Sequence, residues 1–143
     1  MTTQIQPVRT DAEIARCHDV MVQLRPHLTR EEFCARARHQ IDHCGYELVQ
    51  LSHDGEVRAV AGFRVSHNLA WGHYLYVDDL VTDEGARSEG HGEAMLRWLI
   101  EQARSLDCDE LHLDSGVQRF AAHRFYLRHR MQIASHHFSL SLK

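Results

Sequence analysis

The sequence predicts an α+β fold in which helices flank both faces of a mixed, mostly antiparallel sheet. Two observations predict it: three consecutive strand-like segments joined by tight turns, and a later strand–helix–strand unit. Strands joined by short turns pair antiparallel, whereas strands joined through a helix lie parallel with a right-handed crossover. A sheet that contains both arrangements is mixed, and the helices between its strands cover its faces.

A short strand and a helix begin the chain. Residues 5–8 are predicted to form the strand. Thr10 and Glu13 then make a capping box, in which each side chain satisfies a backbone N–H group at the start of a helix. Apolar residues recur at helical spacing, which predicts one amphipathic helix over residues 11–25 that ends at Pro26.

A second helix follows directly. Thr29 and Glu32 form another capping box, and a sparse apolar stripe continues to about residue 43. Gly45 is suited to the left-handed position that closes many helices.

Three strands come next, at residues 46–52, 57–65 and 74–82. The Asp-Gly pair at 54–55 is a favoured hairpin turn, and residues 68–72 provide the second turn. These turns predict an antiparallel meander.

The last third of the chain alternates between helices and strands. A glycine-containing loop at 85–92 leads into a strongly amphipathic helix at 93–106. A short strand at 111–114, a helix at 120–130 and a final strand at 136–142 follow. No repeat or linker interrupts this order, so residues 1–143 are predicted to form a single domain.

Composition narrows the class of protein. The chain is 43% hydrophobic and 25% charged, as in soluble globular proteins. No apolar run approaches the roughly 20 residues that a membrane-spanning helix needs, and the polar N-terminus lacks a signal-peptide core. The net charge of −4 argues against a nucleic-acid binder. We therefore expect a cytoplasmic protein with no nucleic-acid or membrane partner.

Cysteines and histidines give no metal or disulfide pattern. The four cysteines, at positions 17, 34, 44 and 108, form no CxxC pair. His39 and His43 lie four residues apart on a predicted helix, next to Cys44, but this segment lacks the Glu of an HExxH motif. No second cluster of matching spacing occurs, so we predict no metal site.

The candidate ligand-binding site lies where the strand at 74–82 is followed by a loop and a helix. The loop contains Arg87, Gly90 and Gly92. Glycines let the backbone approach a ligand closely, and the free N–H groups of a helix start point at one place. This arrangement suits a phosphate or pyrophosphate, although it is also found in plain turns. No Gly-Lys-Ser/Thr follows, which excludes a P-loop, and the meander upstream is unlike a dinucleotide-binding repeat.

The motif Arg87-x-x-Gly90-x-Gly92 resembles the Arg/Gln-x-x-Gly-x-Gly/Ala signature of the GNAT acetyltransferases. It has the right strand before it and the right helix after it. Residues 113–119, with the alanine at 122 four residues before Tyr126, are similar to the final segment of that family. The order of elements resembles the GNAT fold over nearly the whole chain, and in that fold the central strand is bulged and splayed from its parallel neighbour.

The resemblance implies that the protein binds acetyl-CoA and an amine acceptor. The loop backbone and the arginine would cradle the pyrophosphate, and the strand backbone would bond the pantetheine arm. The cofactor-binding residues it implies are Leu80, Val81, Thr82, Arg87, Ser88, Glu89, Gly90, His91, Gly92, Arg119 and Ala122.

The same resemblance implies catalytic roles. The Leu80 N–H would stabilise the oxyanion of the tetrahedral intermediate. Tyr126 would protonate the departing CoA thiolate as the general acid, and the alternative for Tyr126 is a core aromatic.

The general base is less determined. Asp78 lies two residues before Leu80 and is the leading candidate. Asp79, a histidine such as His73, and a water molecule stay open for this role, and one of the histidines at 136–137 could line the acceptor site.

Three positions depart from the family pattern. Ser88 stands where many relatives have glycine, which serine replaces without strain only at negative φ. Arg119 stands where an asparagine that helps to bind pantetheine is common. Arg130 replaces a glycine after the last helix, where a left-handed turn would be strained.

The function expected from the resemblance is transfer of the acetyl group of acetyl-CoA to a primary amine of a small molecule or peptide, directly within a ternary complex. Two alternatives stay open: a non-catalytic acyl-CoA-binding or regulatory module on the same fold, and a metal-dependent hydrolase that uses the histidines. The segments expected to shape the acceptor site carry no signature of a particular amine. Relatives are often dimers, and a homodimer is one open oligomeric state.

Overall fold

A computed structural model describes residues 2–143, which form two compact units: one up to His112 and one from Leu113 to Lys143. The first unit holds the sheet and four of the helices. Within the described residues, no helix combines the length and apolar character that crossing a membrane requires.

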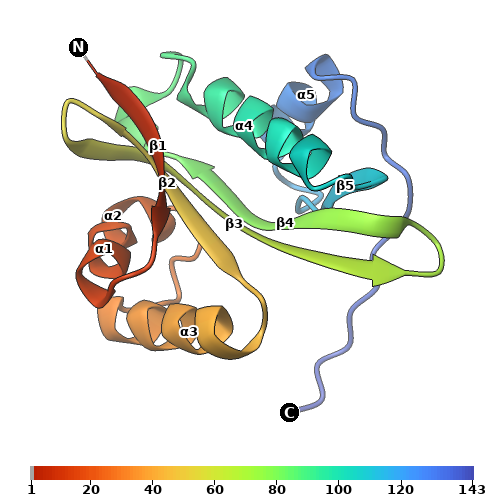
Figure 1. Cartoon of the computed structure of the whole chain (residues 1–143), viewed down its shortest axis with the longest axis horizontal. Helices are drawn as coiled ribbons and strands as arrows, with labels where there is room; N and C mark the ends of the chain where they lie inside the picture. Colours follow the sequence, from red (N-terminus) through yellow and green to blue (C-terminus); the bar gives the residue numbers. More distant parts are fainter. Residues whose placement is uncertain (1) are drawn as a thin grey trace. The chain divides into compact units, whose positions relative to one another are not determined.

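The sheet has five strands in the order of the sequence (Figure 1). They are β1 (Thr3–Val8), β2 (Glu47–His53), β3 (Glu56–Asn68), β4 (Gly72–Thr82) and β5 (Glu110–Leu113). The first three pairings are antiparallel. Asp54 and Gly55 have φ of 52° and 82°, as the predicted hairpin turn between β2 and β3 requires.

Strand β5 runs parallel to β4. The N–H of Asp109, just before β5, donates to the carbonyl of His73 near the start of β4 at 2.6 Å. The N–H of His73 donates in return to Asp109 Oδ2 at 3.0 Å. Both strands therefore begin at the same end of the sheet, and the predicted mixed sheet is confirmed.

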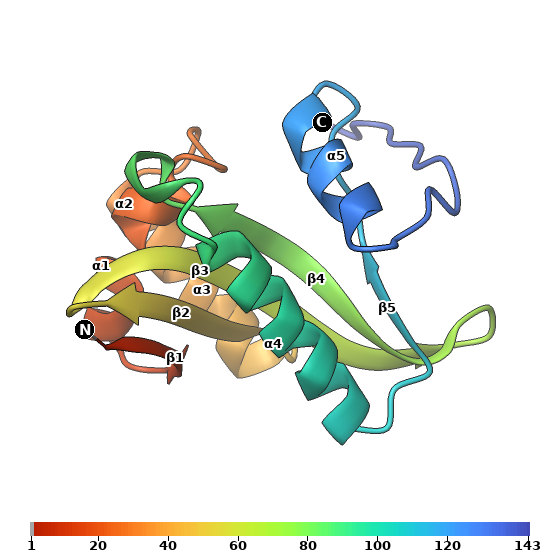
Figure 2. The same cartoon turned by 90° about the horizontal axis from the view of Figure 1, so that it is seen from above.

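Helices cover both faces of this sheet (Figure 2). Three lie on one face: α1 (Asp11–Arg16), α2 (His18–Met21) and α3 (Arg30–His43). The fourth, α4 (His91–Ser105), lies on the other face, where it buries Met95, Leu96 and Leu99. The predicted capping box forms in full at Thr10 and Glu13. At Thr29 the side chain accepts a hydrogen bond from the N–H of Glu32, and its hydroxyl donates to the Glu32 carboxylate.

The prediction of one helix over residues 11–25 was wrong, because the helix breaks at Cys17. The N–H of Cys17 bonds to the carbonyl of Ile14, three residues back, and its ψ of −13° opens the following turn. Ile14, Cys17 and Met21 are all buried nevertheless. The apolar spacing therefore predicts which face of this segment is buried. It does not predict where the helical hydrogen bonds are interrupted.

The second unit contains α5 (Phe120–Arg128) and an extended segment without strand pairing. The prediction of a strand at 136–142 was therefore wrong. Its alternating apolar side chains, Phe138, Leu140 and Leu142, are between 83% and 91% exposed. Alternating apolar and polar side chains are typical of a strand, but a strand also needs a neighbouring backbone with which to form hydrogen bonds. Arg130 has φ of 67°, the strained conformation anticipated for a non-glycine there.

Candidate active site

Strand β4 carries a bulge near the middle of the sheet. In the pairing with β3, Asp79 lies opposite Gly62 and Val77 lies opposite Phe63, so Asp78 is an extra residue without a partner. Because strand side chains alternate between faces, one extra residue brings two successive side chains to the same face. The bulge implied by the family resemblance is present, and it carries two neighbouring carboxylates.

Asp79 is the more buried of the two carboxylates, with 14% of its side chain exposed against 22% for Asp78. The Tyr46 hydroxyl donates to Asp79 Oδ2 at 2.7 Å, and Arg25 Nε donates to Oδ1 at 2.9 Å. Arg25 Nη2 also donates to the carbonyl oxygen of Asp78 at 2.9 Å, so this guanidinium spans the bulge. Two residues from the loops on either side of α3 therefore hold the Asp79 carboxylate in place.

Tyr46 packs closely on the backbone of β3. It is buried, and a Cβ atom at position 62 would overlap its ring and hydroxyl, so Gly62 is required by this close approach. Burial and the nearby Asp79 charge raise the pKa of Tyr46 well above its usual value. The hydroxyl therefore stays protonated and acts as a hydrogen-bond donor.

Asp78 is held by a different arginine. Arg64 on β3 donates from Nε to Oδ2 and from Nη2 to Oδ1, both at 2.8 Å. Such a bidentate pair is among the stronger polar contacts in proteins, and its hydrogen bonds raise the pKa of Arg64. Both oxygens of the leading candidate base are thus already engaged by one guanidinium.

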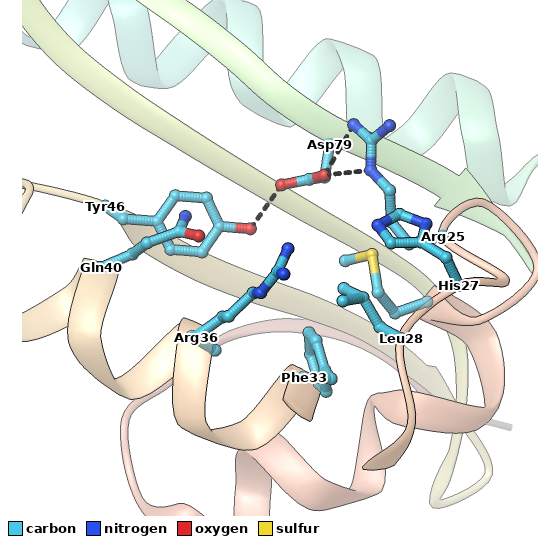
Figure 3. A pocket seen from close by; sticks show the side chains of 10 residues that line it. Arg25, His27, Leu28, Phe33, Arg36, Gln40, Tyr46 and Asp79 are labelled. Atoms are coloured by element: carbon cyan, nitrogen blue, oxygen red, sulfur yellow. Dashed lines mark hydrogen bonds and ion pairs between the residues drawn. The ribbon is translucent and has the colours of Figure 1, made fainter. Parts of the chain in front are cut away.

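A pocket of about 230 Å³ opens beside Asp79, between the α1–α3 layer and the bulge (Figure 3). This is smaller than the roughly 300–1,000 Å³ of drug-sized sites and suits a small group. Apolar side chains and a set of polar ones share its wall: Met21, Arg25, His27, Leu28, Phe33, Arg36, Ala37, Gln40, Tyr46 and Asp79. Asp79 lines this pocket and Asp78 does not.

The last residues of β4 extend past the end of β5, so one edge of their backbone is not paired with β5. The N–H of Asp83 bonds to the carbonyl of Arg58 on β3, which sets the alternation of the antiparallel ladder. Val81, two residues before Asp83, therefore also directs its N–H and C=O groups toward β3. Leu80 and Thr82, which alternate with it, direct theirs away from β3. Strand β5 has four residues and starts level with the start of β4, so it ends before residue 80.

The predicted phosphate loop leads into α4 through a left-handed residue. Gly90, the residue before the helix, has φ of 83° and offers no side-chain cap, so the first N–H groups of α4 are free to meet a ligand. The His91 side chain is buried, which leaves its backbone N–H at the helix start. Arg87 is exposed and follows the short helix η1 (Glu84–Ala86).

Ser88 does not adopt the negative φ at which serine would replace the family's glycine without strain. Its φ is 76°, in the left-handed region. The backbone at Ser88 therefore has the left-handed conformation that a glycine would adopt without strain, at a cost of about 1–2 kcal/mol in conformational free energy.

Tyr126, the predicted acid, lies half-buried on α5 in the second unit, as does Ala122. Burial raises the pKa of Tyr126, and a hydrogen bond from the side chain of Arg119 opposes part of this rise. Arg119, which the resemblance placed on the cofactor, is thus a direct partner of the phenol at the start of the same helix.

The histidines do not assemble into a cluster. The rings of His39 and His43 lie 5.0 Å apart, and His73 contacts the carbonyl of Asp107 at 3.3 Å, about 20 Å along the strand from Asp79. Among residues 2–143, no group of three or more His, Cys, Asp or Glu side chains is placed to hold a metal ion.

Sequence reasoning missed the residues that surround Asp79. Arg25, Arg36 and Tyr46 lie in helices and loops that match no motif. The available signal was Gly62, a lone glycine inside an apolar strand, which indicates a close approach by another group.

Comparisons with known proteins agree with this arrangement. The family model described as the acetyltransferase (GNAT) family matches residues 12–130. YhdJ of Bacillus subtilis (strain 168), described as an uncharacterized N-acetyltransferase, is 32% identical over 114 residues, which are 80% of this chain and 80% of that protein.

Solved structures share the fold. Glucosamine-6-phosphate N-acetyltransferase from Arabidopsis thaliana has a TM-score of 0.76 at 19% identity, with 100% of both chains covered. The aminoglycoside N-acetyltransferase AAC(6')-Iy, in complex with CoA, has a TM-score of 0.85 at 10% identity, with 98% of this chain and 94% of that chain covered. With the family match over residues 12–130, the conclusion is that this chain belongs to the GNAT family of acetyltransferases.

Proposed function

We propose that the protein transfers the acetyl group of acetyl-CoA to a primary amine of a small molecule or peptide, in a ternary complex. The observation that carries the proposal is that the backbone edge at Leu80 and Thr82, turned away from β3, is followed along the chain by the left-handed entry to α4 at Gly90. These two features offer hydrogen-bond groups for an amide-containing arm and for a pyrophosphate, in the order in which CoA carries them.

The pyrophosphate is bound at the start of α4. The N–H groups of residues 91–93 have no intrahelical acceptor, and the helix dipole favours negative charge there. Arg87, which has no ion-pair or hydrogen-bond partner among residues 2–143, adds a cation beside them.

The pantetheine arm lies along the open edge of β4. Leu80 and Thr82 supply the backbone bonds, because the Val81 backbone is turned toward β3 and its side chain is buried. The Leu80 N–H is the donor for the thioester carbonyl. As that carbonyl becomes an oxyanion, a fixed donor stabilises the transition state more than the ground state.

The amine enters the pocket beside Asp79. Its nitrogen lone pair attacks the thioester carbon, a C–N bond forms and the C–S bond breaks. Asp79, held by Tyr46 and Arg25, orients the amine and accepts its proton directly or through water. This assigns to Asp79 the role first given to Asp78: an arginine pairs with each carboxylate, but only Asp79 lines the pocket.

The CoA thiolate leaves with a proton from Tyr126. The raised pKa of this tyrosine keeps the phenol protonated at neutral pH, as a general acid requires. Arg119 stabilises the tyrosinate that forms when the proton departs, because its positive charge lies against the phenol.

The test is to incubate the purified full chain with acetyl-CoA and a pool of primary amines, and to follow CoA thiol release and acetylated products by mass spectrometry. The expected result is an acetylated amine with equimolar CoA, and much slower formation with Tyr126→Phe. Tight acetyl-CoA binding without transfer to any amine would favour the non-catalytic acyl-CoA-binding module instead. Failure to bind acetyl-CoA would exclude both the acetyltransferase and the acyl-CoA-binding module.

A further inference from the structure

The polar groups that line the Asp79 pocket include more hydrogen-bond donors than free acceptors. Its single carboxylate already accepts hydrogen bonds at both oxygens, from Tyr46 and Arg25. The pocket wall also contains the Gln40 amide and the His27 ring, and it contains the Arg36 guanidinium, which has donors only, so that donors are in excess. A ligand that matches this pocket must bring acceptors, and preferably charge.

Arg36 is the centre of this imbalance. It projects from α3 into the pocket (Figure 3). Within the part of the chain that the structure describes, its guanidinium has no hydrogen-bond or ion-pair partner. The other two arginines of α3 differ in this respect, since Arg30 pairs with Asp19 and Arg38 pairs with Asp11 and Asp42.

The pocket therefore has a net positive charge before any ligand arrives. Arg25 and Arg36 contribute two positive charges and Asp79 one negative charge, so these three groups together carry one positive charge. Arg25 already compensates Asp79 at 2.9 Å, so the uncompensated charge is that of Arg36. A polycationic acceptor such as a polyamine is repelled by this field, whereas an acceptor with an anionic group is attracted.

We propose that the acceptor is an amine that also carries an oxyanion, a carboxylate or a phosphate, and that Arg36 binds this oxyanion while the amine lies toward Asp79. This inference rests on the proposed acetyl transfer and specifies its substrate class. The planar guanidinium fork fits a carboxylate or phosphate with two hydrogen bonds. The apolar wall of Met21, Leu28 and Phe33 accommodates a hydrocarbon portion of the same molecule.

The test uses pairs of amines that differ only in the oxyanion. The full chain is assayed for CoA release with phenylalanine against phenylalaninamide, with O-phosphoethanolamine against ethanolamine, and with spermidine. The amide has the more weakly basic amine and is the intrinsically easier nucleophile at neutral pH. A preference for the acid must therefore come from binding.

The expected result is that kcat/KM is at least about tenfold higher for the anionic member of one pair, with spermidine the poorest substrate. The carboxylate pair and the phosphate pair together distinguish the two sources of the oxyanion. Arg36→Gln should remove most of this preference through KM, and Arg36→Lys should keep part of it. Arg30→Gln, which removes the same charge from the same helix outside the pocket, should retain it.

Acetyl-CoA binding, measured separately by calorimetry, separates the two levels of the proposal. If acetyl-CoA does not bind, the acetyltransferase function itself fails. If acetyl-CoA binds and the neutral amines or spermidine are acetylated at least as well as their anionic partners, the oxyanion inference is overturned while the function stands. An anionic preference that survives unchanged in Arg36→Gln, or no turnover of any anionic amine by protein that binds acetyl-CoA, also overturns it.

Discussion

The Tyr46 hydroxyl donates a hydrogen bond of 2.7 Å to Asp79 Oδ2 and thereby connects the loop after α3 to the bulge of β4. Arg25 approaches the same carboxylate from the loop before α3. The proposed acceptor side of the site thus lies in the helical layer, and the proposed cofactor side lies at the edge of β4 and the start of α4.

Removal of this hydroxyl should weaken both stability and activity. Tyr46→Phe leaves a buried carboxylate oxygen with one donor fewer, at an expected cost of about 1–3 kcal/mol in the free energy of unfolding. Urea unfolding monitored by circular dichroism measures it. Tyr74→Phe is the matched control, since the Tyr74 hydroxyl has no hydrogen-bond partner among residues 2–143. Equal losses in both variants would contradict the assigned role of Tyr46.

Gly62→Ala should be destabilising because the new methyl group meets the Tyr46 ring. The φ of position 62 lies outside the left-handed region, so the effect is steric overpacking of about 1–3 kcal/mol. The same substitution in a Tyr46→Ala background should cost much less, which a double-mutant cycle detects. Strict additivity of the two changes would show that the contact between them is not the cause.

The two carboxylates of the bulge should differ in kinetics. Asp79→Asn removes the carboxylate that faces the pocket, and we expect kcat to fall by about 10²–10⁴-fold. Asp78→Asn leaves the pocket wall intact and should lower kcat much less. Steady-state assays with one common amine compare them. The reverse order of effects would return the base to Asp78.

Tyr126→Phe should lower kcat by about 10²–10⁴-fold with little change in acetyl-CoA affinity, because in the proposed mechanism the phenol protonates the leaving thiolate and does not contribute to binding. The direction of the pKa shift gives a second measurement. A general acid is active below its pKa, and burial raises that of Tyr126 above its ordinary value of 10.0. The wild-type rate should therefore not decline with pH until above pH 10. An unchanged kcat in the variant would rule out this acid.

Cys17 should be unreactive in the folded protein. Burial raises the pKa of its thiol to about 12, so at pH 8 the reactive thiolate is on the order of 10⁻⁴ of the total. Cys44 is exposed and should react with a thiol reagent at once. Mass spectrometry after brief alkylation, with and without denaturant, assigns the sites. Alkylation of Cys17 as fast as Cys44 under native conditions would contradict the described packing of α1 and α2.

Much of the fold follows from local patterns. Turn residues such as Asp54-Gly55 and the capping boxes at Thr10 and Thr29 act over a few residues, and each predicted its boundary correctly. The break at Cys17 could not be predicted in this way, because apolar spacing continues through it. The final segment at 136–142 shows the converse limit, since alternation alone does not supply a pairing partner.

The residues of the proposed cofactor side form a pattern that is visible in the sequence, whereas those of the proposed acceptor side do not. The Arg87 to Gly92 motif is contiguous, so its spacing is visible in the chain. The contacts of Asp79 join Arg25 and Tyr46, which are 54 and 33 residues away in sequence. The bulge brings both adjacent aspartates to one face, and a bulge position is set by pairing with β3. Their different partners, Arg25 and Tyr46 for Asp79 and Arg64 for Asp78, then leave only Asp79 in the pocket wall.

Isothermal titration of acetyl-CoA into the purified protein, with CoA and NAD as comparisons, tests the central claim most directly. We expect micromolar binding of acetyl-CoA and CoA and none of NAD, with acetyl-CoA binding weakened by Arg87→Ala. The absence of binding to either form of CoA would contradict the assignment of the β4 edge and the α4 start as the acyl-CoA site, and with it the proposed acetyl transfer.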